Sequence, residues 1–284
     1  MILQYYNNRV IQNYDIIVLQ YYKIVNFTKT KKMNNIIAIT NNKGGVGKTT
    51  SALNIGAGLA KLNKKVLLID LDSQANLSSC FGVDIDNQNN VGNYMMGEGG
   101  FDKFVMKEGN LHLLPSSKFL RETEEKLASK PKRDEILKKK LKDIKSNYDF
   151  IIIDCPPSLG LLTNNALYAA DYYLAPIEAG VFSYNGISNL IHHINELNEE
   201  YDAEVKLLGV LIVKFHENKR GTLKKGIVAR VKENMEDDVF KTYIREDIKL
   251  IESPLHYKNI FEYAPESKGA EDYLNVCKEI IEKL

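Results

Sequence analysis

The chain has 284 residues, of which 44% are hydrophobic and 26% are charged, and its formal net charge is +1. These values are typical of a globular protein with room for one large domain or two small ones. The near-zero net charge gives no reason to expect nucleic-acid binding by the chain as a whole, so any basic binding surface must be local.

Cysteine usage and apolar runs point to the cytoplasm. Cys80, Cys155 and Cys277 are widely spaced and form no CxxC pair, which disfavours a disulfide framework and favours a reducing compartment. No stretch approaches 18 consecutive apolar residues, and the tyrosine-rich start has no apolar core typical of a signal peptide. We therefore expect a cytoplasmic protein.

Residues 1–32 differ from the rest of the chain. They are rich in Tyr, Asn, Gln and Ile, and residues 2–6 nearly repeat as residues 18–22. Met33 then opens a run with the pattern of a strand. We expect Met33 to be the biological start and residues 1–32 to be an N-terminal extension, flexible or not native. The alternative is an arm or short helix that carries a partner contact.

From residue 33 onward, short apolar runs alternate with longer amphipathic ones. The expected strands are 36–40, 66–70, 111–115, 150–154, 172–177, 207–213 and 239–244. The expected helices are 48–62, 121–145, 163–169, 186–199, 222–236 and 270–284. This alternation predicts an α/β fold with a doubly wound, mostly parallel sheet, helices on both faces, and ligands at the carboxyl ends of the strands. No Pro/Gly/Ser-rich linker interrupts residues 33–284, so we expect one domain there.

A glycine-rich loop between the first strand and the first helix predicts a phosphate-binding site. Gly44, Gly45 and Gly47 allow backbone N–H groups to turn toward phosphates, and the helix N-terminus adds its dipole. Lys48 supplies a cation for the β- and γ-phosphates, and the Thr49 hydroxyl can bind magnesium. The expected nucleotide-binding residues of the loop are Lys43, Gly44, Gly45, Val46, Gly47, Lys48, Thr49 and Thr50.

The loop departs from the common GxxxxGK[ST] pattern, because Asn42 stands where the first glycine is required. Lys-Gly-Gly-Val-Gly-Lys-Thr stands there instead, and it resembles the deviant Walker A loop of the family that includes ParA/Soj partition ATPases, MinD and the nitrogenase iron protein. The resemblance implies that Lys43 reaches across a dimer interface to the partner's nucleotide.

Two further apolar strands end in aspartates that are placed to complete the site. Residues 66–76 end in Asp70 and Asp72, and residues 150–154 end in Asp154, an arrangement that delivers carboxylates toward magnesium and water. By resemblance to the family's switch I, Asp72 positions the attacking water, although Ser73 replaces the usual proline. The predicted magnesium ligands are Thr49, Asp72 and Asp154. Asp70 is expected to have a structural role.

The parts predict hydrolysis of ATP to ADP and phosphate with Mg²⁺, slow in the absence of a partner. Lys48 and a partner's Lys43 would stabilise the charge that develops on the transferred phosphoryl group while Asp72 orients water, which makes these three the expected catalytic residues. Lys214 and Phe215, just past a strand end, are the expected adenine contacts.

The resemblance to the ParA/Soj family covers about residues 34–284, including segments at 176–188, 239–254 and 263–273. It implies an ATP-dependent sandwich homodimer that binds double-stranded DNA without sequence specificity, associates with the nucleoid, and is stimulated by a ParB-type centromere-binding protein. Phosphate-directed cations suit such binding. The expected DNA contacts are Lys219, Arg220, Lys224, Lys225, Arg230 and Arg245.

Three alternatives stay open. One is a membrane-cycling ATPase of the MinD type, which the acids among the lysines of the C-terminal helix disfavour, so that no membrane contact is expected. Another is a positioning ATPase that carries a protein cargo instead of DNA. The third is a nucleotide-dependent scaffold with negligible turnover.

Overall fold

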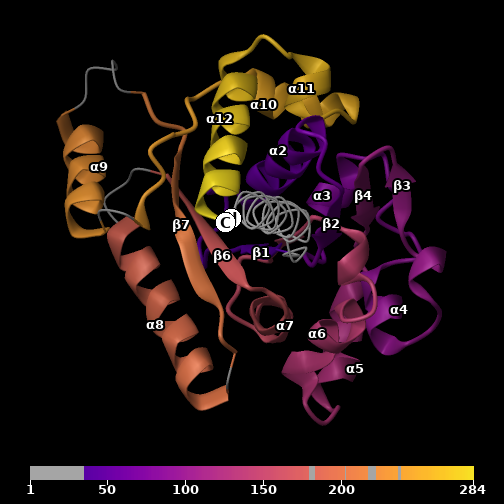
Figure 1. Cartoon of the computed structure of the whole chain (residues 1–284). Coiled ribbons are helices and arrows are strands. Elements are labelled where there is room, and N and C mark those ends of the chain that lie inside the picture. The colour runs from indigo at the N-terminus through magenta and orange to yellow at the C-terminus, as the bar shows by residue number, and fades with distance from the viewer. Residues whose placement is uncertain (1–34, 179–182, 202, 217–221, 236–237) are drawn as a thin grey trace, which may run out of the picture. The chain divides into compact units, whose positions relative to one another are not determined.

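The computed structural model describes residues 35–178, 183–201, 203–216, 222–235 and 238–284 (Figure 1). The predicted N-terminal extension, residues 1–32, lies outside these ranges. Residues 34–284 form one compact unit.

Within the described residues, seven strands form one sheet in the order β3-β4-β2-β5-β1-β6-β7. Neighbouring strands are parallel except for β3 and β4, which are antiparallel. The strands are β1 (Asn35–Ile39), β2 (Val66–Asp70), β3 (Met106–Glu108), β4 (Leu111–Leu114), β5 (Phe150–Asp154), β6 (Tyr172–Glu178) and β7 (Lys206–Val213). The doubly wound, mostly parallel sheet predicted from the sequence is confirmed.

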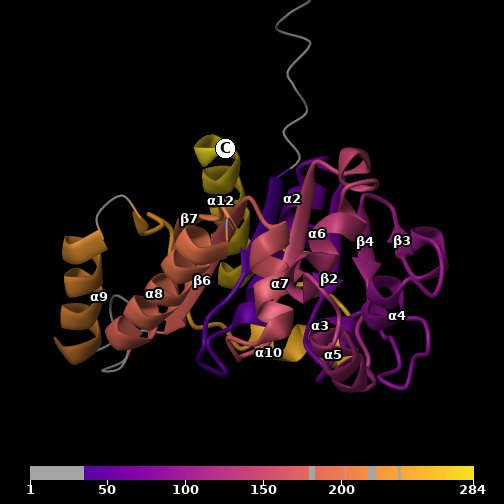
Figure 2. The ribbon, with the colours of Figure 1, turned by 90° about the horizontal axis from the view of Figure 1, so that it is seen from below.

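Helices cover both faces of this sheet, as Figures 1 and 2 show. The α-helices are α2 (Lys48–Lys61), α3 (Asn76–Ser79), α4 (Val91–Met96), α5 (Leu120–Ala128), α6 (Ile136–Leu141), α7 (Leu161–Ala169), α8 (Ser183–Tyr201), α9 (Thr222–Met235), α10 (Lys249–Glu252), α11 (Ile260–Tyr263) and α12 (Lys268–Lys283). On one face α2, α11 and α12 pack over strand residues such as Ile37 and Leu68, and on the other α5, α6 and α7 pack over residues such as Leu67. Every residue of β1, β2 and β5 is buried, which explains their nearly continuous Ile, Leu and Val content.

The prediction of one continuous helix over residues 121–145 is wrong. It divides into α5, a 3₁₀ turn at Arg133–Glu135 and α6. Pro131 follows α5 within three residues, and a proline in a helix interior removes a hydrogen bond and clashes with the preceding turn. The short strand β3 was not predicted.

The strand predicted over residues 239–244 is also wrong. The segment makes one isolated bridge to β7, from Val239 to Val210, and donates to it from the backbone N–H groups of Phe240 and Ile244. The reason lies in α12, where the Glu279 carboxylate accepts the backbone N–H groups of Lys241 (2.8 Å) and Thr242 (3.2 Å). These two N–H groups are therefore not available for hydrogen bonds to β7. The segment continues as a loop toward the carboxyl edge of the sheet.

Across the described ranges, no helix combines the length and the apolar character needed to cross a bilayer.

Candidate functional site

The glycine-rich loop joins the end of β1 to the start of α2 at the carboxyl edge of the sheet. Gly45 and Gly47 have φ angles of 74° and 80°, which favour glycine because other residues are strained there. The Asn41 amide donates to the carbonyl of Pro176 at 2.8 Å, and its side-chain oxygen accepts from the backbone N–H of Lys43 at 3.0 Å. The entrance of the loop is thereby fixed to β6.

The two lysines of the loop lie in different environments. Lys48 is buried, and its Nζ donates to the carbonyl oxygen of Lys43 at 3.1 Å. Burial lowers the pKa of Lys48, while the nearby carboxylate of Asp154 acts in the opposite direction. The Lys43 side chain is exposed at the loop entrance. One cation therefore lies within the loop, and the other extends from it into solvent.

Asp154 ends β5 next to this loop and is 1% exposed. Neither of its carboxylate oxygens has a hydrogen-bond partner within the described residues. Burial and the neighbouring Asp70 raise the pKa of Asp154 well above its usual value, and the Thr49 hydroxyl and Lys48 oppose this effect. A buried carboxylate without donors is costly unless a cation compensates for it.

Asp70 and Asp72 have different surroundings at the end of β2. The Asp70 carboxylate accepts from the Ser78 backbone N–H (2.8 Å), the Ser78 hydroxyl (2.7 Å) and the Asp72 N–H (3.0 Å). It thus shapes the turn after β2, in line with a structural role. Within the described residues, the half-buried Asp72 carboxylate accepts one local bond, from Gln74 at 2.9 Å, and the Ser116 hydroxyl donates to the Asp72 carbonyl at 2.7 Å.

These residues fit a magnesium ion. Asp154 offers two oxygens that lack donors, and the half-buried Thr49 hydroxyl interacts with it from the first turn of α2. The described residues hold no group of three or more His, Cys, Asp or Glu side chains that could bind a metal by themselves. Magnesium does not require such a group, because it keeps several waters and is bound through one or two carboxylates together with phosphates.

A cavity of about 260 Å³ opens beside the loop, slightly below the roughly 300 Å³ at which small-molecule sites begin. Sequence reasoning missed most of its wall, because the wall combines segments that are far apart in the chain. Its lining includes Gly47, Thr50, Val213, Ile244, Leu250 and Tyr273. An apolar cavity that adjoins a phosphate loop suits the base of a nucleotide, and we call it the base pocket.

The two predicted adenine contacts have different positions. Lys214 lines the base pocket, but its Nζ donates to the Gly45 carbonyl at 2.8 Å and lies 3.4 Å from the Glu178 carboxylate. Phe215 is 4% exposed, and its ring packs edge-on against Tyr243 at a centroid distance of 5.1 Å. The Phe215 ring is therefore part of the core, and the prediction that Phe215 contacts adenine stays a prediction.

The predicted DNA contacts are only partly described. Lys219 and Arg220 lie outside the described residues, as do the side chains of Lys224 and Lys225 on α9. Arg230 is exposed on α9, whose Val228 and Val231 pack into the core. Arg245 pairs with Asp272 and Glu271 beside the base pocket, which argues against its use as a DNA contact.

Comparisons with known proteins agree with this geometry. A protein family described as an AAA domain matches residues 34–207. The sporulation initiation inhibitor protein Soj of Bacillus subtilis is 38% identical over 87% of this chain and 98% of its own length. The chromosome-partitioning ATPase Soj of Thermus thermophilus is 35% identical over 87% of this chain and 96% of its own.

A solved structure adds a bound nucleotide. Cobyrinic acid a,c-diamide synthase of Mycobacterium smegmatis, crystallised with an ATP analogue and magnesium, superposes with a TM-score of 0.74. It is 29% identical, and the match covers 86% of this chain and 93% of that protein.

Proposed function

The chain belongs to the ParA/Soj family of partition ATPases, as predicted from its loop, and we propose that it moves DNA through an ATP-dependent cycle of dimerisation and DNA binding. As a member of this family it hydrolyses ATP to ADP and phosphate, with Mg²⁺ as cofactor. The dimer, the DNA surface and the ParB-type partner are the proposed parts of the cycle.

The observation that carries the proposal is the contrast between the two lysines of the loop. Lys48 is buried and bonded within its own loop, whereas Lys43 is exposed at the entrance. A second cation that is exposed at the loop entrance, and is not buried in its own site, supports a role at the nucleotide of a second copy. Charge that develops on a transferred phosphoryl group requires such preorganised cations.

The chemistry of hydrolysis follows from the remaining residues. Magnesium neutralises charge on the β- and γ-phosphates when it is bound. Thr49 and Asp154 would hold it, and Lys48 would bind the same phosphates. Asp72 is half-buried near these groups, and among the described residues its side chain accepts one local bond, so it can orient a water molecule. We also propose that Asp72 contacts magnesium through a water molecule, as predicted from the sequence.

DNA binding is proposed for the α9 region. Arg230 is exposed there, and the sequence places Lys219, Arg220, Lys224 and Lys225 close to it along the chain. Cations that contact phosphates bind DNA without reading its sequence, and the affinity falls steeply with salt. A DNA-bound dimer would associate with the nucleoid.

The test compares DNA with membrane in parallel sedimentation assays. The protein is mixed with random-sequence duplex DNA or with anionic vesicles, each with ATP, with ADP or without nucleotide. We expect ATP-dependent, salt-sensitive DNA binding that is lost when Lys224, Lys225 and Arg230 are all replaced by Ala. Unchanged DNA binding by that variant would refute this surface, and ATP-dependent vesicle binding in place of DNA binding would favour a membrane-cycling ATPase.

A phosphate-release assay addresses turnover. We expect slow hydrolysis by the protein alone and faster hydrolysis when a ParB-type partner and DNA are added. No release under any of these conditions would favour a nucleotide-dependent scaffold.

A further inference from the structure

One wall of the base pocket is a loop that also lines a second hollow. Residues 245–248 belong to no helix and no strand of the sheet. Residues 245–247 line the base pocket, and residues 246–248 also line an open hollow of about 740 Å³ together with residues 264–268. Apart from the backbone bridge between Arg245 and Phe215, side-chain tethers hold this loop.

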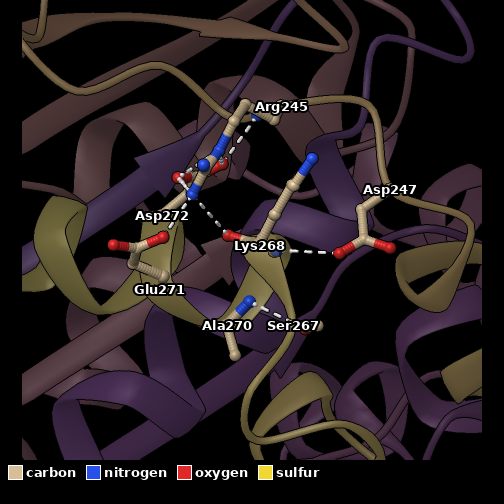
Figure 3. Close-up of polar contacts among 8 residues, drawn as sticks. Arg245, Asp247, Ser267, Lys268, Ala270, Glu271 and Asp272 are labelled. Carbon is tan, nitrogen blue, oxygen red and sulfur yellow. Dashed lines mark hydrogen bonds and ion pairs between the residues drawn. The ribbon is translucent and has the colours of Figure 1, made fainter.

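The first tether is Arg245, which is bound on both its backbone and its side chain (Figure 3). Its backbone N–H donates to Asp272 Oδ2 at 2.8 Å, and its Nε lies 3.0 Å from both Asp272 oxygens. Its Nη2 donates to Asp272 Oδ1 at 2.6 Å and also to the carboxylate of Glu271. The exposed fractions of the Arg245 and Asp272 side chains are 27% and 7%, so the pair is largely shielded from water.

The second tether is Asp247, two residues further along the same loop. Its Oδ2 accepts from the backbone N–H of Gly269 at 2.9 Å, in the first turn of α12, and its Oδ1 accepts from the Lys249 N–H at 3.0 Å. Figure 3 shows Arg245 and Asp247 reaching the start of α12 from the same loop. Both tethers therefore end on one helix.

That helix is itself fixed to α2, the helix that begins at the phosphate loop. The hydroxyl groups of Tyr273 and Ser51 lie 3.2 Å apart, and Cys277 Sγ donates to the Ile55 carbonyl at 3.4 Å. The wall of the base pocket is thus connected to the phosphate loop through α12, in addition to its bonds to the end of β7.

We propose that Arg245 is a positioning residue for the nucleotide, acting through an ion-paired clasp that comprises Arg245, Glu271 and Asp272. The clasp fixes the distance between the pocket wall and the phosphate loop. At this distance the base of one nucleotide can occupy the base pocket while its phosphates occupy the loop. This inference rests on the proposed nucleotide site. It predicts that the clasp affects binding of the base and leaves binding of the phosphates unchanged.

Bidentate pairing explains why the clasp can set a position. A guanidinium that shares two bonds with one carboxylate fixes direction as well as distance. Removal of Arg245 leaves the shielded Asp272 carboxylate without its cation, and removal of Asp272 leaves Arg245 paired with the more exposed Glu271. Either change should destabilise the fold, whereas replacement of both partners by apolar residues is often neutral. Stability and positioning can therefore be separated by experiment.

The test uses four variants of the full chain: Arg245→Leu, Asp272→Leu, the double variant, and Lys107→Ala as control. Lys107 lies on the edge strand β3 and forms an ion pair with Asp102. This pair lies outside the base pocket and the phosphate loop. Calorimetry measures the Kd of ATP and of inorganic tripolyphosphate, both with magnesium, and thermal unfolding measures the Tm. Tripolyphosphate probes the phosphate loop without a base.

We expect both single variants and the double variant to bind ATP about tenfold more weakly and tripolyphosphate with unchanged affinity, because only the base contacts shift. The Tm should fall in the single variants and recover in the double variant, and the control should match the wild type. Recovery of ATP affinity together with Tm in the double variant would overturn the inference, as would an equal loss for both ligands. If the wild type binds neither ATP nor tripolyphosphate, the proposed function is overturned. If the wild type binds ATP and tripolyphosphate with equal affinity, both the base pocket and the clasp are refuted.

Discussion

Asp70 and Asp154 face each other in register across the parallel ladder at the carboxyl ends of β2 and β5. Both are buried, but only Asp70 has hydrogen-bond donors within the described residues, from Ser78 and from the backbone of Asp72. Two carboxylates in one buried site disfavour each other's ionisation. The site therefore gains stability when a cation is bound beside Asp154.

The first prediction concerns this pair in the nucleotide-free protein. Burial raises the pKa of Asp70 from 3.8 to about 6, and it raises that of Asp154 as well. Between pH 4 and 6 the native state then holds more protons than the unfolded state, so stability falls as pH rises through this window and stays reduced above it. Asp154→Asn should remove the part of this loss that comes from Asp154, while the part from the buried Asp70 remains, and should raise the Tm at pH 7.5 by roughly 3 to 8 °C.

Thermal unfolding from pH 4.5 to 7.5 in the presence of a chelator measures the effect. The variant should also show a shallower decline across the window than the wild type. Glu125→Gln on the exposed side of α5 neutralises an acid outside the site and should change neither value. A lower Tm for Asp154→Asn at pH 7.5 would show that the ionised carboxylate stabilises the fold.

The second prediction concerns the cation within the loop. Lys48→Met keeps an apolar stem but removes the ammonium that reaches the Lys43 carbonyl, and it leaves the phosphates without their nearest buried cation. We expect ATP affinity to fall by about 100-fold or more, since charge-assisted bonds to phosphate are lost. Calorimetry with Mg-ATP measures this, with Lys61→Met at the other end of α2 as the matched control. Equal affinities for the two variants would contradict the assignment.

Much of the fold could be predicted because its local patterns agree with its tertiary structure. Strands β2 and β5 have the predicted bounds, since continuous Ile, Leu and Val runs suit strands buried on both faces. The segment at 239–244 also contains β-branched and aromatic residues, but its bonds to β7 are interrupted where Lys241 and Thr242 donate to Glu279, a residue about forty positions away. A local pattern cannot reveal such competition.

The candidate site divides in the same way. Its phosphate loop is one continuous motif, so its residues could be named from the sequence. The base pocket joins the start of α2 with Val213, Ile244 and Tyr273, and nothing in their local sequence relates them. Arg245 was predicted to contact DNA. Its partner Asp272 lies 27 positions away on α12, so the sequence could not show that the two residues pair in the folded chain.

The third prediction separates ATP binding from hydrolysis at Asp72. Asp72→Ala keeps the main-chain bonds from Ser116 and to Asp70, and it loses only the side-chain bond with Gln74 and the water-positioning carboxylate. ATP should bind within about threefold of the wild-type affinity, whereas turnover should fall by about 100-fold or more. Calorimetry and phosphate release measure the two quantities. Normal hydrolysis by this variant would disprove the role, and Asp84→Ala in the exposed loop after α3 should behave as wild type.

The fourth prediction tests whether Lys43 acts on the nucleotide of a second copy. Lys43→Ala should bind ATP but hydrolyse it poorly, because its own loop retains Lys48 while the partner's site lacks the second cation. In a mixed dimer with Asp72→Ala, the site of the Lys43→Ala subunit keeps its own Asp72 and receives the partner's intact lysine. An equimolar mixture of two inactive variants should therefore regain up to about a quarter of wild-type turnover, since half of the dimers are mixed and each has one complete site. Mixing Lys43→Ala with the double variant Lys43→Ala/Asp72→Ala provides the control, because no complete site can form. A mixture with Asp72→Ala that is no more active than its separate components would place the action of Lys43 within its own subunit.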